Sequence, residues 1–176
     1  KLQIILSVIL GFMLLALLSI ALGNVLALAQ NNLKRLFAYS AIAHMGFMLM
    51  GIVMNTHTGY SAAMFYILLY ALMSAGAFAM LIILGRKGYE VVNLEDLKGL
   101  SARSPWFAFM FLLILFSMAG IPPTAGFYAK FAIIESVVEA KFVWAAVFMV
   151  VMSVIGAFYY LRMIKVMYFD KPNEQP

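Results

Sequence analysis

The chain has 176 residues, of which 66% are hydrophobic and only 11% charged, whereas a soluble domain carries about 25% charged residues and could not bury this much apolar surface. It has no cysteine, which excludes disulfides and thiolate metal ligands. Its two histidines are widely separated and give no reason to expect a metal site. The net charge of +5 comes from Lys and Arg in short segments between long apolar runs, which is typical of membrane topology and not of nucleic-acid binding.

Five apolar stretches follow one another along the chain, and each is long enough to cross about 30 Å of hydrocarbon, which takes about 20 helical residues. In chain order they are residues 2–29, 36–54, 62–84, 105–138 and 142–167. We therefore expect an all-α integral membrane fold, with about five transmembrane helices in a single transmembrane domain. The chain enters its first helix directly after Lys1 without the pattern of a signal peptide, so we expect a fragment of a longer chain.

The positive charges predict an orientation. If the five helices alternate in direction, one side receives the segments 30–35 and 85–104 and the C-terminal tail, while the other receives Lys1 and Lys141. The first side holds nine positive residues, namely Lys34, Arg35, Arg86, Lys87, Lys98, Arg103, Arg162, Lys165 and Lys171. Because Lys and Arg favour cytoplasmic loops, we expect this side in the cytoplasm. Within the segment 85–104, a short amphipathic helix is expected near 93–100.

The fourth apolar stretch should not be one continuous helix. At 34 residues it would be about 50 Å long, and its middle, from Gly120 to Gly126, reads GIPPTAG. Two prolines remove backbone donors, and the flanking glycines permit unusual backbone conformations. We therefore predict two half-helices joined by an unwound link at membrane depth. Such links mark ion sites in transporters.

Lys130 follows this link, in what we predict to be the first turn of the second half-helix. A lysine at the bilayer centre costs about 2.5–3.5 kcal/mol on insertion scales, and the positive end of that half-helix also disfavours the ammonium form. We therefore interpret Lys130 as a residue that exchanges protons. Two simpler interpretations stay open, a lysine whose ammonium reaches the outer interface and a lysine in a structural ion pair.

Other polar residues are expected inside the membrane. His44 lies about 15 Å along the second helix from Lys34 and is a candidate proton relay, because the reference pKa of histidine is near neutral; the alternative is a neutral histidine bonded to a carbonyl. Tyr66, Tyr70 and Ser74 form a stripe that could carry ordered water or simply join helices. Glu135 could line an exit path or be a solvated carboxylate at the interface.

The pair Tyr159 and Tyr160, followed by Arg162, fits an aromatic belt with an anchor at the inner membrane surface.

Two motifs resemble a known family. Residues 28–47 read LAQNNLKRLFAYSAIAHMGF and resemble a signature of the antiporter-like proton-pumping subunits of respiratory complex I (NADH:quinone oxidoreductase) and of multisubunit cation/proton antiporters. Residues 120–131 read GIPPTAGFYAKF and are most similar to the chain N branch of that family, since chain M usually has glutamate where this sequence has Lys130. The resemblance extends over nearly the whole chain.

The resemblance implies a fold of two inverted five-helix repeats, of which this chain is the second. It implies that Lys130 carries protons, that His44 belongs to a central polar axis, and that quinone reduction elsewhere drives proton transport. No cofactor is expected in this chain, because NADH, flavin, iron–sulfur clusters and quinone would be bound by other subunits. The expected partners are other membrane subunits of complex I, lipid, protons and water, with no nucleic acid, in a bacterial inner membrane.

Two alternatives are a subunit of a cation/proton antiporter and a membrane scaffold subunit without transport.

Overall fold

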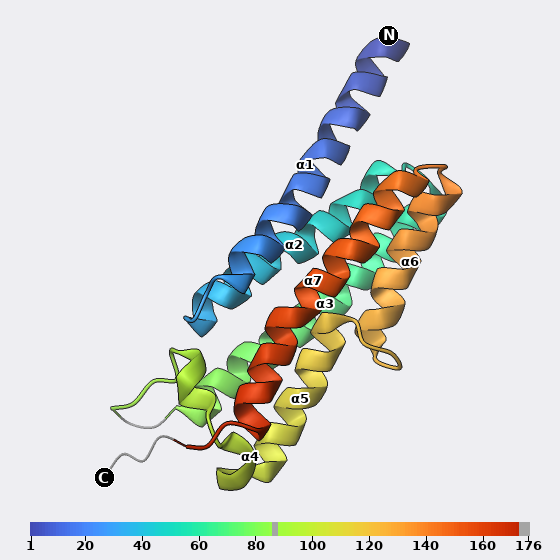
Figure 1. Cartoon of the computed structure of the whole chain (residues 1–176). Helices are drawn as coiled ribbons and strands as arrows, with labels where there is room; N and C mark the ends of the chain where they lie inside the picture. The colour runs from blue at the N-terminus through green and yellow to red at the C-terminus, as the bar shows by residue number, and fades with distance from the viewer. Residues whose placement is uncertain (86–87, 173–176) are drawn as a thin grey trace.

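The computed structural model describes residues 1–85 and 88–172, and within these ranges the chain folds into helices without a β-strand (Figure 1). The long helices are α1 (Leu2–Leu28), α2 (Leu33–Val53), α3 (His57–Leu84) and α7 (Val143–Tyr168). Two shorter helices, α5 (Pro105–Ala119) and α6 (Ala125–Glu139), take the place of the fourth predicted span. A 3₁₀ helix, η1 (Leu94–Leu97), and the single turn α4 (Leu100–Arg103) lie in the connection between α3 and α5.

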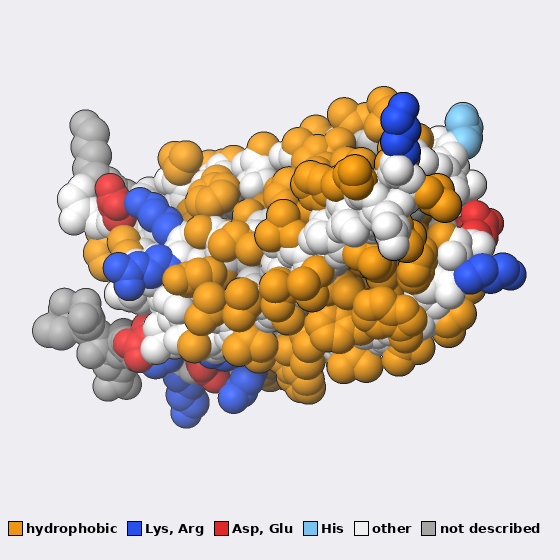
Figure 2. Space-filling view, turned by 90° about the horizontal axis from the view of Figure 1, so that it is seen from above, with side chains coloured by type: hydrophobic (Ala, Val, Ile, Leu, Met, Phe, Trp, Pro, Cys, Tyr) orange, Lys and Arg blue, Asp and Glu red, His pale blue; other side chains and the backbone are white. Residues whose placement is uncertain are grey.

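The helices have the length and polarity of a membrane-spanning bundle. Among the described residues, α1, α2, α3 and α7 are each long and apolar enough to cross a bilayer, and α5 is a shorter apolar helix. In the view of Figure 2, charged side chains gather at the two ends of the molecule, and the surface between them is largely hydrophobic. The predicted fold class, an all-α membrane protein with a broken fourth span, is confirmed.

Two predicted helix starts need correction. Helix α2 begins at Leu33 and not near residue 36, because the side chain of Asn32 accepts a hydrogen bond from the backbone N–H of Arg35. Helix α3 begins at His57 and not near residue 62, because Thr56 caps it in the same way through Gly59. Such capping bonds satisfy backbone donors that a helix start leaves free.

The predicted amphipathic helix near 93–100 is instead divided into η1 and α4, because Gly99 has a φ of 69°. Arg86 and Lys87, which entered the predicted charge count, lie outside the described residues.

Helices α1 and α2 pack closely through small residues. A Cβ atom on Gly23 would lie 2.6 Å from the backbone nitrogen of Ala43, and one on Gly46 would lie 2.7 Å from the carbonyl oxygen of Ala16. Close approach of this kind is how helices associate in membranes, where no hydrophobic driving force acts between them. The N-terminal half of α1 extends beyond the other helices (Figure 1), and Leu2 is 82% exposed.

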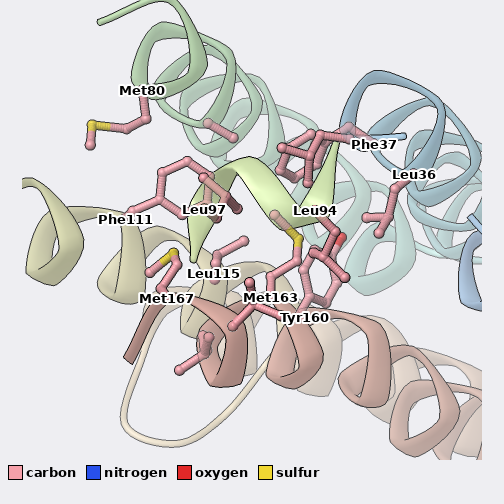
Figure 3. Packing of buried hydrophobic residues seen from close by; sticks show 14 of the residues in the cluster. Leu36, Phe37, Met80, Leu94, Leu97, Phe111, Leu115, Tyr160, Met163 and Met167 are labelled. Carbon is pink, nitrogen blue, oxygen red and sulfur yellow. The ribbon is translucent and has the colours of Figure 1, made fainter. Parts of the chain in front are cut away.

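The connection between α3 and α5 inserts apolar side chains into the bundle. Leu94 and Leu97 of η1 are buried among side chains of α2, α3, α5 and α7 (Figure 3). Leu94 also donates its backbone N–H to Asn31, and Leu33 donates to the carbonyl of Val92, at 2.9 and 2.8 Å. The connection is therefore a packed part of the fold.

At the same end of the molecule, Arg162 of α7 is hydrogen-bonded to the end of α1 and the turn after it. Its guanidinium donates to the backbone carbonyls of Leu28 and Gln30, at 2.9 and 2.6 Å. The Leu28 carbonyl is at the end of α1, where a helix leaves acceptors free, and the Gln30 carbonyl is in the turn that follows. The contact joins α1 to α7 beside the turn that leads into α2.

Asp96 organises the connection from within. Its carboxylate accepts hydrogen bonds from the Tyr89 hydroxyl and from the backbone N–H groups of Val92 and Asn93, at 2.7–2.9 Å. Partial burial raises the pKa of Asp96, but the hydrogen bonds from Asn93, Tyr89 and Val92 outweigh it, so the pKa lies below the ordinary value of 3.8.

We predict that this segment loosens in acid. Because folding lowers the pKa of Asp96, its stabilising contribution is complete above the ordinary carboxyl pKa and is lost as the pH falls through the lower, folded-state value. Hydrogen exchange at Val92 and Asn93, corrected for intrinsic rates, should become several-fold faster in acid.

Asp96→Asn should exchange quickly already at neutral pH, whereas Glu95→Gln, a matched change next to it, should behave like the unchanged protein. Equal exchange in the two variants at neutral pH would contradict this role for Asp96.

Candidate functional site

The break in the fourth span is built by the end of α5. Gly120 has a φ of 76°, and the backbone N–H of Ile121 donates to the carbonyl of Phe116 across it, at 3.1 Å. This is the glycine-dependent way of ending a helix, because a residue with a Cβ rarely adopts such a φ. A Cβ on Gly120 would also lie 2.9 Å from the Lys130 side chain, so the glycine leaves room for the lysine.

The start of α6 lies directly against the end of α5. A Cβ on Gly126 would lie 1.6 Å from the carbonyl oxygen of Ser117, a distance that no adjustment of a side chain could relieve. The backbone N–H of Gly126 donates to the Ser117 hydroxyl at 3.1 Å. One donor of the new helix is thus satisfied by the preceding one, as an interrupted backbone requires in a membrane.

Lys130 lies across this break. It is 8% exposed, and its Nζ atom donates to the carbonyl of Ala119, the last residue of α5, at 3.4 Å. The Nζ atom also lies 5.2 Å from the centre of the Phe47 ring, within the range of a cation–π contact.

One detail of the prediction for Lys130 was wrong. The residue is in the second turn of α6 and not the first, because α6 already begins at Ala125, inside the predicted link. Besides the positive end of α6, the ammonium has the negative end of α5 beside it, where it contacts a carbonyl. The break therefore supplies a partner for the charged form.

A cavity of about 420 Å³ adjoins Lys130, between α5, α6 and α7. Gly120, Phe131 and Val154 are among its lining residues, and Phe131 is 53% exposed. Ser153 also lines it, and its hydroxyl is buried with no hydrogen-bond partner among the described residues. A buried water needs room and polar partners. The cavity provides the room, and the Ser153 hydroxyl and the Lys130 ammonium are suitable partners.

His44 is the centre of a second polar cluster. Its Nδ1 atom is hydrogen-bonded to the Tyr66 hydroxyl at 2.6 Å, and its Nε2 atom to the Tyr160 hydroxyl at 2.9 Å. The Tyr160 hydroxyl is also hydrogen-bonded to Ser40. Side chains from α2, α3 and α7 thus meet at one imidazole, and His44, Ser40, Tyr66 and Tyr160 are all buried.

The other predicted site residues, Tyr70, Ser74 and Glu135, lie beside the His44 cluster or outside both groups. Tyr70 is half-buried, with its ring centre 4.8 Å from that of His44, and Ser74 lies one turn further along α3. Glu135 is exposed on α6 and belongs to neither group in the described part of the chain.

Phe47 connects the two clusters. Its ring stacks on that of Tyr66 with a centre separation of 6.2 Å and also contacts the Nζ atom of Lys130. A series of contacts through Tyr66 and Phe47 therefore joins His44 to Lys130.

Part of this arrangement differs from the prediction. Tyr159 and Tyr160 do not form an aromatic belt, since each is 1% exposed. The Tyr159 hydroxyl donates to the side chain of Asn24, which itself donates to the carbonyl of Met152. The sequence does contain a signal for this arrangement, a pair of adjacent tyrosines and a lone asparagine within apolar helices. Such polar groups need hydrogen-bond partners in hydrocarbon, so they could have been predicted to contact one another.

Comparison with known proteins decides the family. Residues 4–156 match the family model described as NADH:quinone oxidoreductase/Mrp antiporter, TM. The chain belongs to this family. As a member of the NADH:quinone oxidoreductase/Mrp antiporter family, it is 59% identical over 161 residues to NADH-quinone oxidoreductase subunit N of Thioalkalivibrio sulfidiphilus. The alignment covers 92% of this chain and 34% of that protein.

Solved structures have the same fold. A chain of respiratory complex I from Thermus thermophilus with bound aureothin matches with a TM-score of 0.81 and 35% identity, over 94% of this chain and 37% of that one. A chain of the Mrp complex from Dietzia has the same fold, with a TM-score of 0.85 at 24% identity, over 96% of this chain and 31% of that one.

The resemblance to the chain N branch is thereby confirmed. The chain spans about a third of the length of the curated relatives that it matches.

Gly126 provides a test of the break. We predict that Gly126→Ala prevents α6 from docking on α5 and strongly lowers the amount of folded protein, because the added carbon would overlap a backbone carbonyl. Gly11→Ala is the matched control: a Cβ at Gly11 meets nothing within 4 Å, and alanine is favoured over glycine in a helix by about 1 kcal/mol.

Both variants should be made in the full-length protein and compared by the yield and thermal midpoint of the protein extracted from membranes. A Gly126→Ala protein as stable as the Gly11→Ala protein would show that the break is not packed as described.

Proposed function

We propose that the chain is part of a proton-translocating membrane subunit of NADH:quinone oxidoreductase, and that Lys130 carries the transported proton. The observation that supports this most directly is the position of Lys130. It is buried at a helix break, bonded to one backbone carbonyl at the end of α5, and next to a cavity of about 420 Å³.

The surroundings of Lys130 suit alternation between two protonation states. Hydrocarbon penalises the charged form, by about 2.5–3.5 kcal/mol on insertion scales, while the Ala119 carbonyl and the Phe47 ring favour it. No carboxylate lies within ion-pair distance of Lys130 in the described part of the chain, so no fixed negative charge holds the proton there. A small change in the neighbouring charges can then decide whether Lys130 keeps its proton.

His44 is the proposed relay to Lys130, by way of water. Tyr66, bonded to His44, with Tyr70 and Ser74 on the same helix, would form the polar path along α3, and Glu135 the exit path on the exposed side of α6. In each step a proton leaves one nitrogen or oxygen as the next accepts it, and no redox chemistry takes place in this chain.

The proposed setting follows from the relatives and from the charge distribution. We infer a bacterial inner membrane, with the segments 30–35 and 85–104 and the C-terminal tail in the cytoplasm and with other membrane subunits of complex I as partners. Those other subunits would hold NADH, flavin, iron–sulfur clusters and quinone. The described residues contain no group of histidine and acidic side chains suited to a metal ion. The chain would form the second of two inverted repeats, as a single transmembrane domain of a longer protein.

Lys130→Ala tests the proposal. In the full-length protein, assembled in its complex in inverted membrane vesicles, we predict that NADH-driven acidification and the coupled quinone reductase activity both fall by about a hundredfold, the low end of what a positioned proton-transfer group contributes. Electron transfer from NADH to an artificial acceptor should be unchanged, because it does not involve this chain.

Lys141→Asn is the matched control, since it removes an exposed lysine at the end of α6 and asparagine tolerates its φ of 69°. Unchanged pumping by an assembled Lys130→Ala complex would make Lys130 structural and favour a scaffold role. Proton movement driven by a sodium gradient and independent of NADH would instead favour the cation/proton antiporter.

A further inference from the structure

Both ring nitrogens of His44 are hydrogen-bonded to tyrosine hydroxyls, Tyr66 on Nδ1 and Tyr160 on Nε2. We propose that Tyr160 is a second proton-relay residue, which passes a proton between Ser40 and His44, so that the proton crosses the imidazole from one tyrosine to the other. This inference rests on the proposed function and names the residues that conduct the proton on the α7 side of His44.

The hydrogen-bonding capacity of the four groups supports this. A neutral imidazole has one donor and one acceptor nitrogen, while a hydroxyl can donate one hydrogen bond and accept others. If Tyr160 donates to Nε2, then Nδ1–H donates to Tyr66, and the Tyr160 oxygen is free to accept from Ser40. If the direction reverses, every group is again satisfied. The same side chains therefore support both neutral tautomers of His44.

Transfer through the cluster conserves protons. Ser40 gives its proton to the Tyr160 oxygen and takes one from a water. The Tyr160 O–H bond breaks as Nε2–H forms, the Nδ1–H bond breaks as Tyr66 gains a proton, and Tyr66 passes its original proton to a water. One proton enters and one leaves, with no net charge on the cluster. His44 ends in its other tautomer and has to return before the next proton passes.

Tyr159 provides the comparison at the next position, because its hydroxyl is bonded to Asn24 and not to His44. It is as deeply buried as Tyr160, and the two ring centres are 4.5 Å apart. Its hydroxyl donates to Asn24 at 2.9 Å, and Asn24 donates to the carbonyl of Met152 at 3.1 Å, which ties α1 to α7. Removal of either hydroxyl leaves a cavity of the same small size. Only the Tyr160 hydroxyl, however, is bonded to His44.

The test compares Tyr160→Phe with Tyr159→Phe in the assembled complex, with NADH-driven acidification and quinone reductase activity measured per assembled complex. Tyr160→Phe should lower both by roughly tenfold, below the usual range of about 10²–10⁴ for positioned proton-transfer groups because water can partly replace the hydroxyl. Tyr159→Phe should lower thermal stability and leave the activities per complex unchanged. Equal activities in the two variants would overturn the proposal.

If the Tyr160→Phe complex does not assemble, a second measurement distinguishes a proton-relay role of Tyr160 from a packing role. 3,5-Difluorotyrosine keeps the shape and the hydroxyl but makes the hydroxyl more acidic. At position 160 it should move the pH profile of coupled turnover and change its solvent deuterium isotope effect, whereas at position 159 both should stay as in the unchanged complex. No change at position 160 would overturn the relay.

Lys130→Ala, measured in parallel, keeps the two proposals distinct. Loss of pumping in Lys130→Ala with unchanged pumping in Tyr160→Phe would overturn the relay and leave the proposed function intact. Unchanged pumping in Lys130→Ala would overturn the proposed function itself.

Discussion

A helix that is interrupted inside a membrane leaves backbone donors and acceptors that lipid cannot satisfy, and the segment between Ala119 and Ala125 is arranged around this requirement. Gly120 closes α5 with backbone hydrogen bonds, and Gly126 brings the N-terminus of α6 against Ser117. The carbonyl of Ala119 is then bonded to Lys130. The lysine thus satisfies one carbonyl at the break while the break gives the lysine a partner, so neither feature is readily understood without the other.

The two polar clusters differ in how fully they are satisfied. Around His44, every nitrogen and hydroxyl has a defined partner, contributed by three helices. Around Lys130, one long hydrogen bond, an aromatic ring and a cavity are present. A fully bonded cluster holds its groups in fixed positions, whereas a loosely bonded one can change its charge state at small cost. Phe47 and Tyr66 connect the two clusters, since Phe47 contacts Lys130 and Tyr66 is bonded to His44.

Much of this could be predicted from the residues themselves. The paired prolines between two glycines identified the break, and the isolated Lys130 and His44 identified the buried polar groups, because each is costly in hydrocarbon. The partners of His44 were predicted only in part. Tyr66 fell on a visible polar stripe, but Tyr160 is bonded to His44 from 116 residues away, and helical periodicity carries no information about such distant pairs. Tyr159 and Tyr160 were assigned to an interface for that reason.

The Arg162 guanidinium, described above as a fastening between α1 and α7, has a mechanical consequence. Together with the backbone bonds between residues 31–33 and 92–94, it makes one end of the bundle a rigid base. At mid-depth the chain is instead divided by a five-residue link. Lys130 lies on the α6 side of this link, so the packing of α6 against α3, α2 and α7, and not the base, holds the lysine in place.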